Sequence, residues 1–396
     1  MKSIPIAPLA GIDNASGRDD ALQVGGDDAP KVYLRDAVNV IIDNARASMR
    51  KGLRKTTSTP YADLWQSPLH GDTFARLGAQ WVKVNTADWA HEVLAEVGDG
   101  ALSHLVLNGT VLVAAPAGIF QYDGSAAKPF TIDAPPGPIV TASTGSLEAG
   151  DYGVAVAWLR GALESPLSPI TTHKAAAAGG MQVLLPMVLD PTITGVRMYL
   201  TRHNGGELLR GEDCPVGTTV VNLPTLPKLG APAQFRHMGP MPSGQYLGLW
   251  QGRLVVAQGR TLRFSEAMAY HVHDPRHGFV QMPQRITFVA PVDGGLWVGQ
   301  VDHVVFLRGT APQELVFERK TSRAPVPGST VALASDEAGE ASGGARAAVA
   351  WLSSVGFAMG TPDGGIIEPQ AQRLRAISAT AGSTVVQHGR LTTALR

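Results

Sequence analysis

Two histidines and an aspartate stand close together in one short segment of the sequence. His271 and His273 alternate, so on a β-strand both side chains would face one side of the sheet, and Asp274 follows directly. Imidazole and carboxylate groups are ligands for Zn²⁺ or Fe²⁺. However, no glutamate is placed to act as a general base, and Pro275 interrupts the segment. We therefore expect polar side chains on an exposed loop or at a subunit contact, with a metal site as the alternative.

A second group of candidate residues is a run of five basic side chains within ten positions. Such a run could contact nucleic-acid phosphates without sequence specificity, form a solvated strand face or dock an acidic partner. Lys plus Arg and Asp plus Glu are 33 each, and this net charge of zero excludes a protein that coats nucleic acid. We predict contacts to DNA or to another subunit for a set that combines the run with the two histidines: Arg46, Arg50, Lys51, Arg54, Lys55, His271 and His273.

The sequence lacks the short motifs of common catalytic sites. G-x-S-x-G, H-E-x-x-H and G-x-x-x-x-G-K-[ST] are all absent. Asp293, Asp302 and Asp363 could meet as paired carboxylates, but each stands at a turn position, where aspartate is common. We predict no enzymatic activity and no cofactor.

The cysteine content and the length of the apolar stretches indicate the compartment in which the chain is made and whether it spans a membrane. Cys214 alone cannot form a disulfide framework or a Cys-based zinc site, and we expect it beside a turn. No stretch approaches 18 apolar residues, and no signal-peptide pattern precedes Gly11. We therefore expect no membrane span and synthesis in a reducing compartment.

The elements that must position these residues follow a repeated pattern of strand, tight turn and strand. The clearest copy spans 105–122 and turns at Asn108-Gly109, the strongest short hairpin signal. The pattern recurs at four further places along the chain: 246–264, 286–307, 347–367 and, in part, 74–84. Such spacing predicts small antiparallel sheets of short strands.

Tryptophans accompany these repeats. Trp250, Trp297 and Trp351 fall on successive copies, which favours packing between sheets over an exposed platform for sugars. The stretch from Trp89 to Leu94 suits either a strand or one face of a short helix.

Repeated small meanders favour an all-β fold with a β-propeller-like domain, because packing such sheets in a ring covers their apolar faces and strand edges. A two-sheet sandwich is the alternative. One internal segment instead has the rhythm of a small fibronectin- or Ig-like β-sandwich. We predict four parts along the chain: an irregular N-terminal arm (1–35), the first part of a propeller-like domain (36–139), an inserted sandwich (140–228) and the second part of the propeller-like domain (229–396).

Three segments also resemble a known family. Residues 36–46, followed by Met49-Arg50-Lys51-Gly52, resemble the N-V-D-x-D-N-x-G-x-x-x-x-R-P-G start of tail proteins of short-tailed bacteriophages, the nozzle or tail tubular protein B family. Residues 150–168 with 196–202 are similar to the fibronectin-like module of such proteins. Residues 262–275 resemble their blade element Y-x-S-x-x-x-x-x-x-x-x-x-P, and the three matches follow one another along the chain.

The resemblance implies a structural virion protein whose propeller-like subunits assemble as a homohexameric ring. The ring would form the distal tail tube through which DNA is ejected, between the adaptor or portal and the tail fibres or spikes. It would be made in the host cytoplasm and contact passing DNA transiently and without specificity. Two alternatives stay open: a carbohydrate-binding or -cleaving β-propeller for host attachment, using exposed Trp297 or Trp351 and central carboxylates, and a host-encoded β-propeller scaffold without a viral link.

Overall fold

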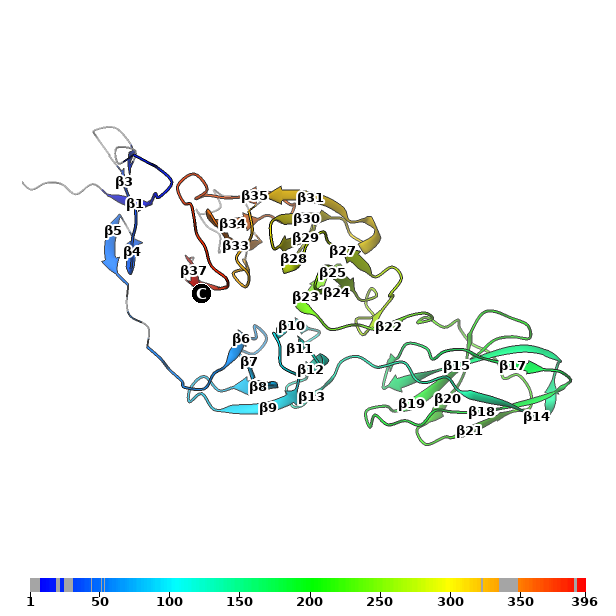
Figure 1. Ribbon diagram of the computed structural model, residues 1–396. Helices are drawn as coiled ribbons and strands as arrows, with labels where there is room; N and C mark the ends of the chain where they lie inside the picture. The colour runs from blue at the N-terminus through cyan, green and yellow to red at the C-terminus, as the bar shows by residue number, and fades with distance from the viewer. Residues whose placement is uncertain are drawn as a thin grey trace, which may run out of the picture. The chain divides into compact units, whose positions relative to one another are not determined.

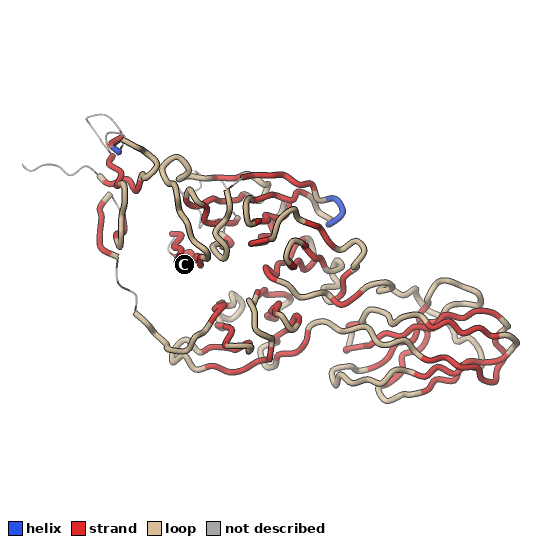
Figure 2. The backbone as a smooth tube through the Cα atoms, in the orientation of Figure 1, coloured by secondary structure: helices blue, strands red, loops and turns tan. Residues whose placement is uncertain are grey.

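The computed structural model describes residues 8–18, 22–24, 31–43, 45–50, 52, 54–321, 323–334, 348–387 and 390–396. These residues form strands and turns almost throughout, with the short 3₁₀ helix η2 (Pro312–Glu314) as an exception (Figure 2). The expected all-β fold is confirmed, as a set of small and mostly antiparallel sheets. The chain divides into a central unit, Tyr61–Gln281, and a terminal unit, Met1–Pro60 with Met282–Arg396.

The central unit contains three four-stranded sheets that are meanders or near-meanders (Figure 1). Each connects short strands through tight turns, and the turn at Asn108 (φ 49°) and Gly109 (φ 74°) joins two strands with the left-handed backbone that a two-residue hairpin requires. The strands are β6 (Ala62–Gln66), β7 (Thr73–Leu77), β8 (Gln80–Val84) and β9 (His91–Glu96); β10 (Ser103–Leu107), β11 (Thr110–Ala115), β12 (Gly118–Tyr122) and β13 (Ala127–Pro129); β23 (Gln245–Trp250), β24 (Arg253–Gln258), β25 (Thr261–Phe264) and β27 (Phe279–Gln281).

The β10–β13 sheet is buried on both faces. Val111 and Val113 of β11 pack with Phe74 and Trp81 of the β6–β9 sheet. Leu112, on the opposite face of the same strand, packs with residues of the β23–β27 sheet. Because side chains alternate along a strand, the apolar residues from Val111 to Ala115 of β11 supply both interfaces at once.

The region between the second and third of these sheets forms two further sheets around a common core. One consists of β14 (Ile139–Leu147), β18 (Gly179–Leu184) and β21 (Val220–Leu223); the other of β15 (Gly150–Arg160), β16 (Leu163–Glu164), β17 (Thr171–Ala175), β19 (Gly195–Leu200) and β20 (Leu209–Pro215). Tyr152, Met181 and Met198 are among the buried residues that fill the space between the two sheets. Hereafter this two-sheet region is called the sandwich.

The short strands β22 (Gly239–Pro240) and β26 (Val272–His273) pair with each other in a separate two-stranded sheet. The strand β22 follows the chain segment that returns from the sandwich, whereas β26 comes later, after β23, β24 and β25.

The terminal unit contains two more four-stranded sheets and three smaller ones. Trp297 and Phe306 of one large sheet pack with Trp351 of the other. The strands are β28 (Ile286–Val292), β29 (Gly295–Gln300), β30 (Val304–Arg308) and β31 (Val316–Thr321); β32 (Val331–Ala332), β33 (Val349–Ser353), β34 (Gly356–Gly360) and β35 (Ile366–Ile367); β36 (Gly382–Gln387) and β37 (Arg390–Leu395); β1 (Leu9–Ile12), β2 (Gln23–Val24) and β3 (Lys31–Leu34); β4 (Val40–Asp43) and β5 (Arg46–Met49).

Several expectations need correction. The N-terminal 35 residues were expected to be irregular, yet the described part contains β1, β2 and β3, and the Asn14 side chain both donates to Arg375 O and accepts from Arg375 N (3.0 and 2.8 Å). The Trp89–Leu94 stretch is not helical, because β9 pairs along its length with β8. The expectation that Cys214 lies beside a turn holds: it is buried near the end of β20, just before the turn at Val216 and Gly217.

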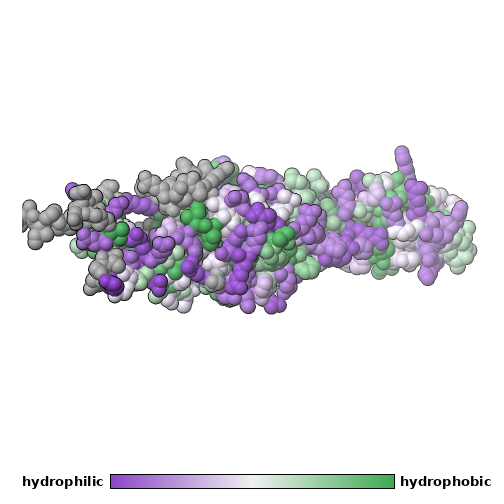
Figure 3. Space-filling model, turned by 90° about the horizontal axis from the view of Figure 1, so that it is seen from above, coloured by the Kyte–Doolittle hydropathy of each residue, from purple (hydrophilic) through white to green (hydrophobic). Residues whose placement is uncertain are grey.

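Within the described ranges no helix is long and apolar enough to cross a membrane. In the face seen in Figure 3, hydrophobic residues occur in small groups among hydrophilic ones.

Trp297 and Trp351 offer a matched test of how these sheets pack. Both are fully buried, but Trp297 Nε1 donates to Thr361 O (2.9 Å), whereas Trp351 Nε1 has no partner among the described residues. Trp→Phe removes the same atoms at both positions, but only Trp297→Phe removes a hydrogen bond; Thr361 O keeps the bond that it accepts from Gly364 N (3.2 Å). We expect Trp297→Phe to lower the free energy of unfolding by about 0.5–1.5 kcal/mol more than Trp351→Phe. Urea unfolding measures this difference, and an equal or reversed order would contradict it.

His104 predicts how stability depends on pH. Its Nε2 accepts a hydrogen bond from Trp81 Nε1 (3.1 Å), the Trp65 ring stacks on it, and burial lowers its pKa from 6.5 to about 3. Below pH 6.5 the unfolded chain therefore binds more protons, and the free energy of unfolding falls as the pH drops toward 3. His104→Gln, which keeps an acceptor but cannot be protonated, should lose less stability between pH 7 and pH 4 than the parent. Identical losses in urea titrations at the two pH values would refute this assignment.

Candidate functional site

The two candidate histidines are buried and not on an exposed loop. His271 and His273 are 5% and 4% exposed, so the expectation of solvated loop side chains was wrong. His271 Nε2 lies 2.8 Å from Glu164 O, and His273 Nδ1 lies 2.8 Å from Phe264 O. Burial lowers the pKa of both imidazoles, which favours their neutral forms. His271 thus joins the loop before β26 to β16, and His273 joins β26 to β25.

The rest of the histidine segment has its own internal partners. Asp274 accepts two hydrogen bonds from the Arg276 guanidinium (3.0 and 2.8 Å), and these bonds lower its pKa to about 2. Over the described ranges no three His, Cys, Asp or Glu side chains are grouped so that they could hold a metal ion.

The basic candidates lie in the terminal unit, apart in the chain from the histidines of the central unit. Arg46 belongs to β5, Arg50 follows it, and Arg54 and Lys55 continue the chain; all four side chains are exposed. Lys51 lies outside the described residues. The exposure of the four arginine and lysine side chains leaves them accessible to a charged partner.

The three turn aspartates do not form one site. The turn that contains Asp293 lies against the turn that contains Asp363, since Gly294 N donates to Pro362 O (3.0 Å). Asp302 lies at the other end of β29 and bonds His303 Nδ1 (2.6 Å). Asp363 accepts from Thr361 Oγ1, as a turn-forming aspartate does.

The tryptophans considered for sugar binding are buried, so they cannot contact a sugar. Trp250, Trp297 and Trp351 are at most 1% exposed and pack inside sheets. Their assignment as packing residues is confirmed.

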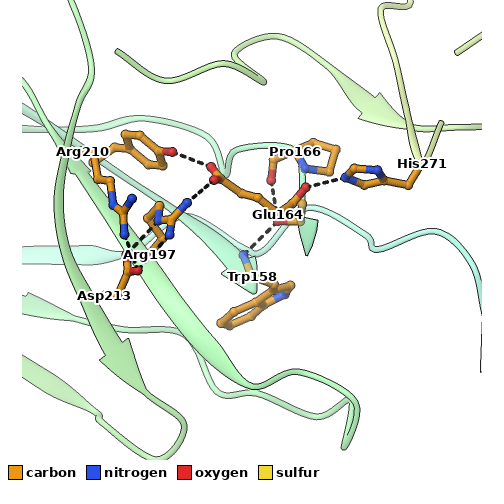
Figure 4. Close-up of polar contacts among 9 residues, drawn as sticks. Trp158, Glu164, Pro166, Arg197, Arg210, Asp213 and His271 are labelled. Atoms are coloured by element: carbon orange, nitrogen blue, oxygen red, sulfur yellow. Dashed lines mark hydrogen bonds and ion pairs between the residues drawn. The ribbon is translucent and has the colours of Figure 1, made fainter. Parts of the chain in front are cut away.

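The densest polar network of the central unit lies on one sheet of the sandwich (Figure 4). Arg197 of β19 binds Asp213 of β20 through Nε and Nη2 (2.7 and 2.8 Å) and Glu164 of β16 through Nη1 (2.6 Å). Tyr199 OH donates to the other oxygen of Glu164 (2.5 Å), and Arg210 Nη2 donates to Asp213 (2.7 Å). One guanidinium therefore joins a carboxylate from the neighbouring strand β20 to one from β16, which lies beyond β15 on the other side of β19.

Local sequence explains why these side chains meet. Arg197 and Tyr199 are two residues apart on β19, so they point to the same face of the sheet. Asp213 pairs directly with Arg197 across the β19–β20 ladder. Glu164 reaches the same face because the β15–β16 hairpin turns back, and Ser165 Oγ fixes the hairpin by accepting from Trp158 N (2.8 Å).

The hydrogen bonds and burial in this network shift the pKa values of Asp213, Tyr199 and Arg197. Hydrogen bonds from Arg197 lower the pKa of Asp213, while burial and the bond to Glu164 raise the pKa of Tyr199. The Asp213 bond also raises the pKa of Arg197. Asp213 is thus bound as a carboxylate and Tyr199 as a neutral phenol, so neither is a ready proton donor or acceptor for a substrate.

A pocket of about 550 Å³ adjoins this network in the central unit. Glu164, Arg197 and His271 form part of its wall, and Phe235, whose ring meets His271 edge-on, forms another part. The β10–β11 turn and the loop before β26 complete it. The pocket was not predicted from the sequence, because its lining comes from segments more than 150 residues apart.

Comparisons with known proteins add little to this geometry. No family model matches the chain, and no curated protein matches it significantly. Solved structures with some likeness include Kluyveromyces lactis Hsv2p (8% identity, 84% of this chain and 89% of that chain, TM-score 0.29), a chain of the mitotic checkpoint complex (9%, 82% and 98%, TM-score 0.22) and the AfRom2 CNH domain (10%, 77% and 92%, TM-score 0.19). TM-scores this low do not establish a shared fold.

The network predicts a specific effect on stability. Arg197→Gln leaves Glu164 and Asp213 without their shared cation, and both Arg197 and Glu164 side chains are under 20% exposed. We expect a loss of about 1–3 kcal/mol in the free energy of unfolding. Arg210→Gln, at a side chain 46% exposed, is the control and should cost no more than about 0.5 kcal/mol. Similar losses for the two variants in urea unfolding would contradict a special role for Arg197.

Proposed function

We propose that the chain is a structural protein of a bacteriophage tail, and that copies of it form a ring, the nozzle or tail tube, through which DNA leaves. In this proposal the four-stranded sheets are blades of a propeller-like domain and the sandwich is a fibronectin-like insertion. The ring joins the adaptor or portal to the distal fibres or spikes. The ring would form from subunits in head-to-tail contact, if the rotation from one subunit to the next returns the last subunit to the first.

The observation that carries the proposal is the order of three motif resemblances along an all-β chain. The first covers the β4–β5 hairpin, the second covers β15, β16 and β19 of the sandwich, and the third covers β25 and β26. Each motif is short, but the three occur in the family's order. The second match lies in the sandwich and the third begins in a four-stranded sheet, which supports the fibronectin-like module and the blade element that the resemblance implies.

The charge of the chain supports a conduit. Equal numbers of acidic and basic residues avoid strong binding to phosphates, which would hold DNA in place instead of letting it pass. The exposed Arg46, Arg50, Arg54 and Lys55 then serve local contacts, to a neighbouring subunit or transiently to DNA.

The alternatives have less support. The carbohydrate-binding propeller was to use exposed Trp297 and Trp351, and both are buried. A host-encoded scaffold without a viral link would have the same fold. On that hypothesis we expect no ring, and no portal or terminase genes next to the encoding gene.

Assembly provides the first test. We expect the purified chain to form a closed ring whose mass is a multiple of 41.6 kDa, seen by light scattering and by electron microscopy of negatively stained particles. A sixfold ring is the expected result. A monodisperse monomer at every concentration tested would contradict ring formation.

Position in the particle provides the second test. Antibody-labelled electron microscopy of virus particles that carry the encoding gene should place the chain in the distal tail. A tail without the label, in particles that keep normal capsid labelling, would reject the proposal.

A further inference from the structure

The pocket beside the Glu164–Arg197 network contains polar groups without partners. The side-chain amides of Asn108, Gln121 and Gln234 line it, and none of the three makes a hydrogen bond to another described residue. Each amide offers two N–H donors and one carbonyl acceptor. They come from three separate segments of the chain: the β10–β11 turn, β12 and the segment after the sandwich.

Aromatic side chains line the same space. Phe130, Phe235 and Tyr270 are each partly exposed at the pocket, and Met268 beside them is 75% exposed. Flat, partly exposed rings next to free amides offer an apolar surface and hydrogen-bonding groups at short range.

The charged groups of the wall contribute no net attraction for an ion. Glu164 is bound by Arg197 and Tyr199, and Arg197 is bound by two carboxylates. The same bonds fix the wall in place, since His271 also bonds the backbone of Glu164 across the pocket's edge. A rigid, electrically balanced pocket suits a neutral ligand with many hydroxyl groups.

We propose that this pocket binds a neutral saccharide, one or two pyranose units of a longer glycan. Its hydroxyl groups would exchange hydrogen bonds with the three amides, and the C–H faces of the rings would lie on the aromatic side chains. The volume of about 550 Å³ lies within the range of small-molecule sites, roughly 300–1,000 Å³. The proposal rests on the pocket alone and does not depend on the tail function.

The pocket chemistry favours a saccharide over a peptide and binding over cleavage. An extended peptide is recognised mainly by backbone groups at a sheet edge, whereas the free groups here are side-chain amides on separate segments. Glycoside cleavage requires two carboxyl groups across the bond. Among the described lining residues Glu164 alone is acidic, and it is engaged by Arg197 and Tyr199.

The test measures binding of defined oligosaccharides to the full chain. Cellohexaose, maltohexaose and N-acetylchitohexaose are the neutral probes, and hexagalacturonate is the charged probe. Saturation-transfer difference NMR and isothermal titration calorimetry give contact and affinity. We expect saturable binding of at least one neutral probe, at least about tenfold tighter than binding of hexagalacturonate, with no release of shorter sugars on long incubation.

Variants locate the binding. Gln121→Ala combined with Gln234→Ala removes two amides that support no other contact, and Phe235→Leu removes a flat ring while it keeps apolar bulk. Each should weaken binding about tenfold without changing the unfolding midpoint. Gln245→Ala, at an exposed glutamine of β23 outside the pocket, is the matched control and should bind as the parent does.

Three results would overturn the proposal: failure of every neutral probe to bind, equal binding of hexagalacturonate, or unchanged binding by the pocket variants. Ring assembly, measured separately by light scattering, would not be affected by any of them. The outcomes for the pocket and for the tail proposal can therefore be told apart.

Discussion

A sheet of four short strands has two faces, and it cannot bury both by itself. In the β10–β13 sheet, every residue of β11 from Val111 to Ala115 is buried, which is possible because neighbouring sheets cover the two faces. The same holds in the terminal unit, where Trp297 and Trp351 lie in the interface between two sheets. Isolated sheets of this size have little core, so each is stable only with its neighbours.

The sandwich is joined to the small sheets in another way. Arg160, at the end of β15, donates to the carbonyls of Pro129 and Thr131 (2.8 and 3.3 Å), just after β13. His271 contacts the backbone of Glu164 at the second connection. These joints rely on hydrogen bonds, which demand defined directions, whereas apolar contacts between sheets tolerate small shifts. A polar joint therefore orients the sandwich, and the pocket beside Glu164 results from that orientation.

Much of the local structure could be predicted from the sequence. The five repeats were placed correctly, because Gly, Asn and Asp at tight turns punctuate short apolar runs, and both signals act within a few residues. The N-terminal strands were missed, since β1 pairs in parallel with β3, a strand that does not follow it directly in the sequence. Cys214 was expected beside a turn from its neighbours Asp213 and Pro215, and a turn does follow at Val216 and Gly217, but its burial in the core between two sheets was not predicted.

The candidate site shows where sequence reasoning ends. Alternation along a strand determines that Arg197 and Tyr199 share a face, and composition determines that the chain carries no net charge. Tertiary structure alone brought Glu164 to Arg197, buried His271 and His273, and placed three amides around one pocket. The physical reason is range: turns and strand alternation depend on neighbouring residues, whereas a pocket depends on how separate sheets pack. That packing is set by contacts between residues far apart in the chain, which no local pattern encodes.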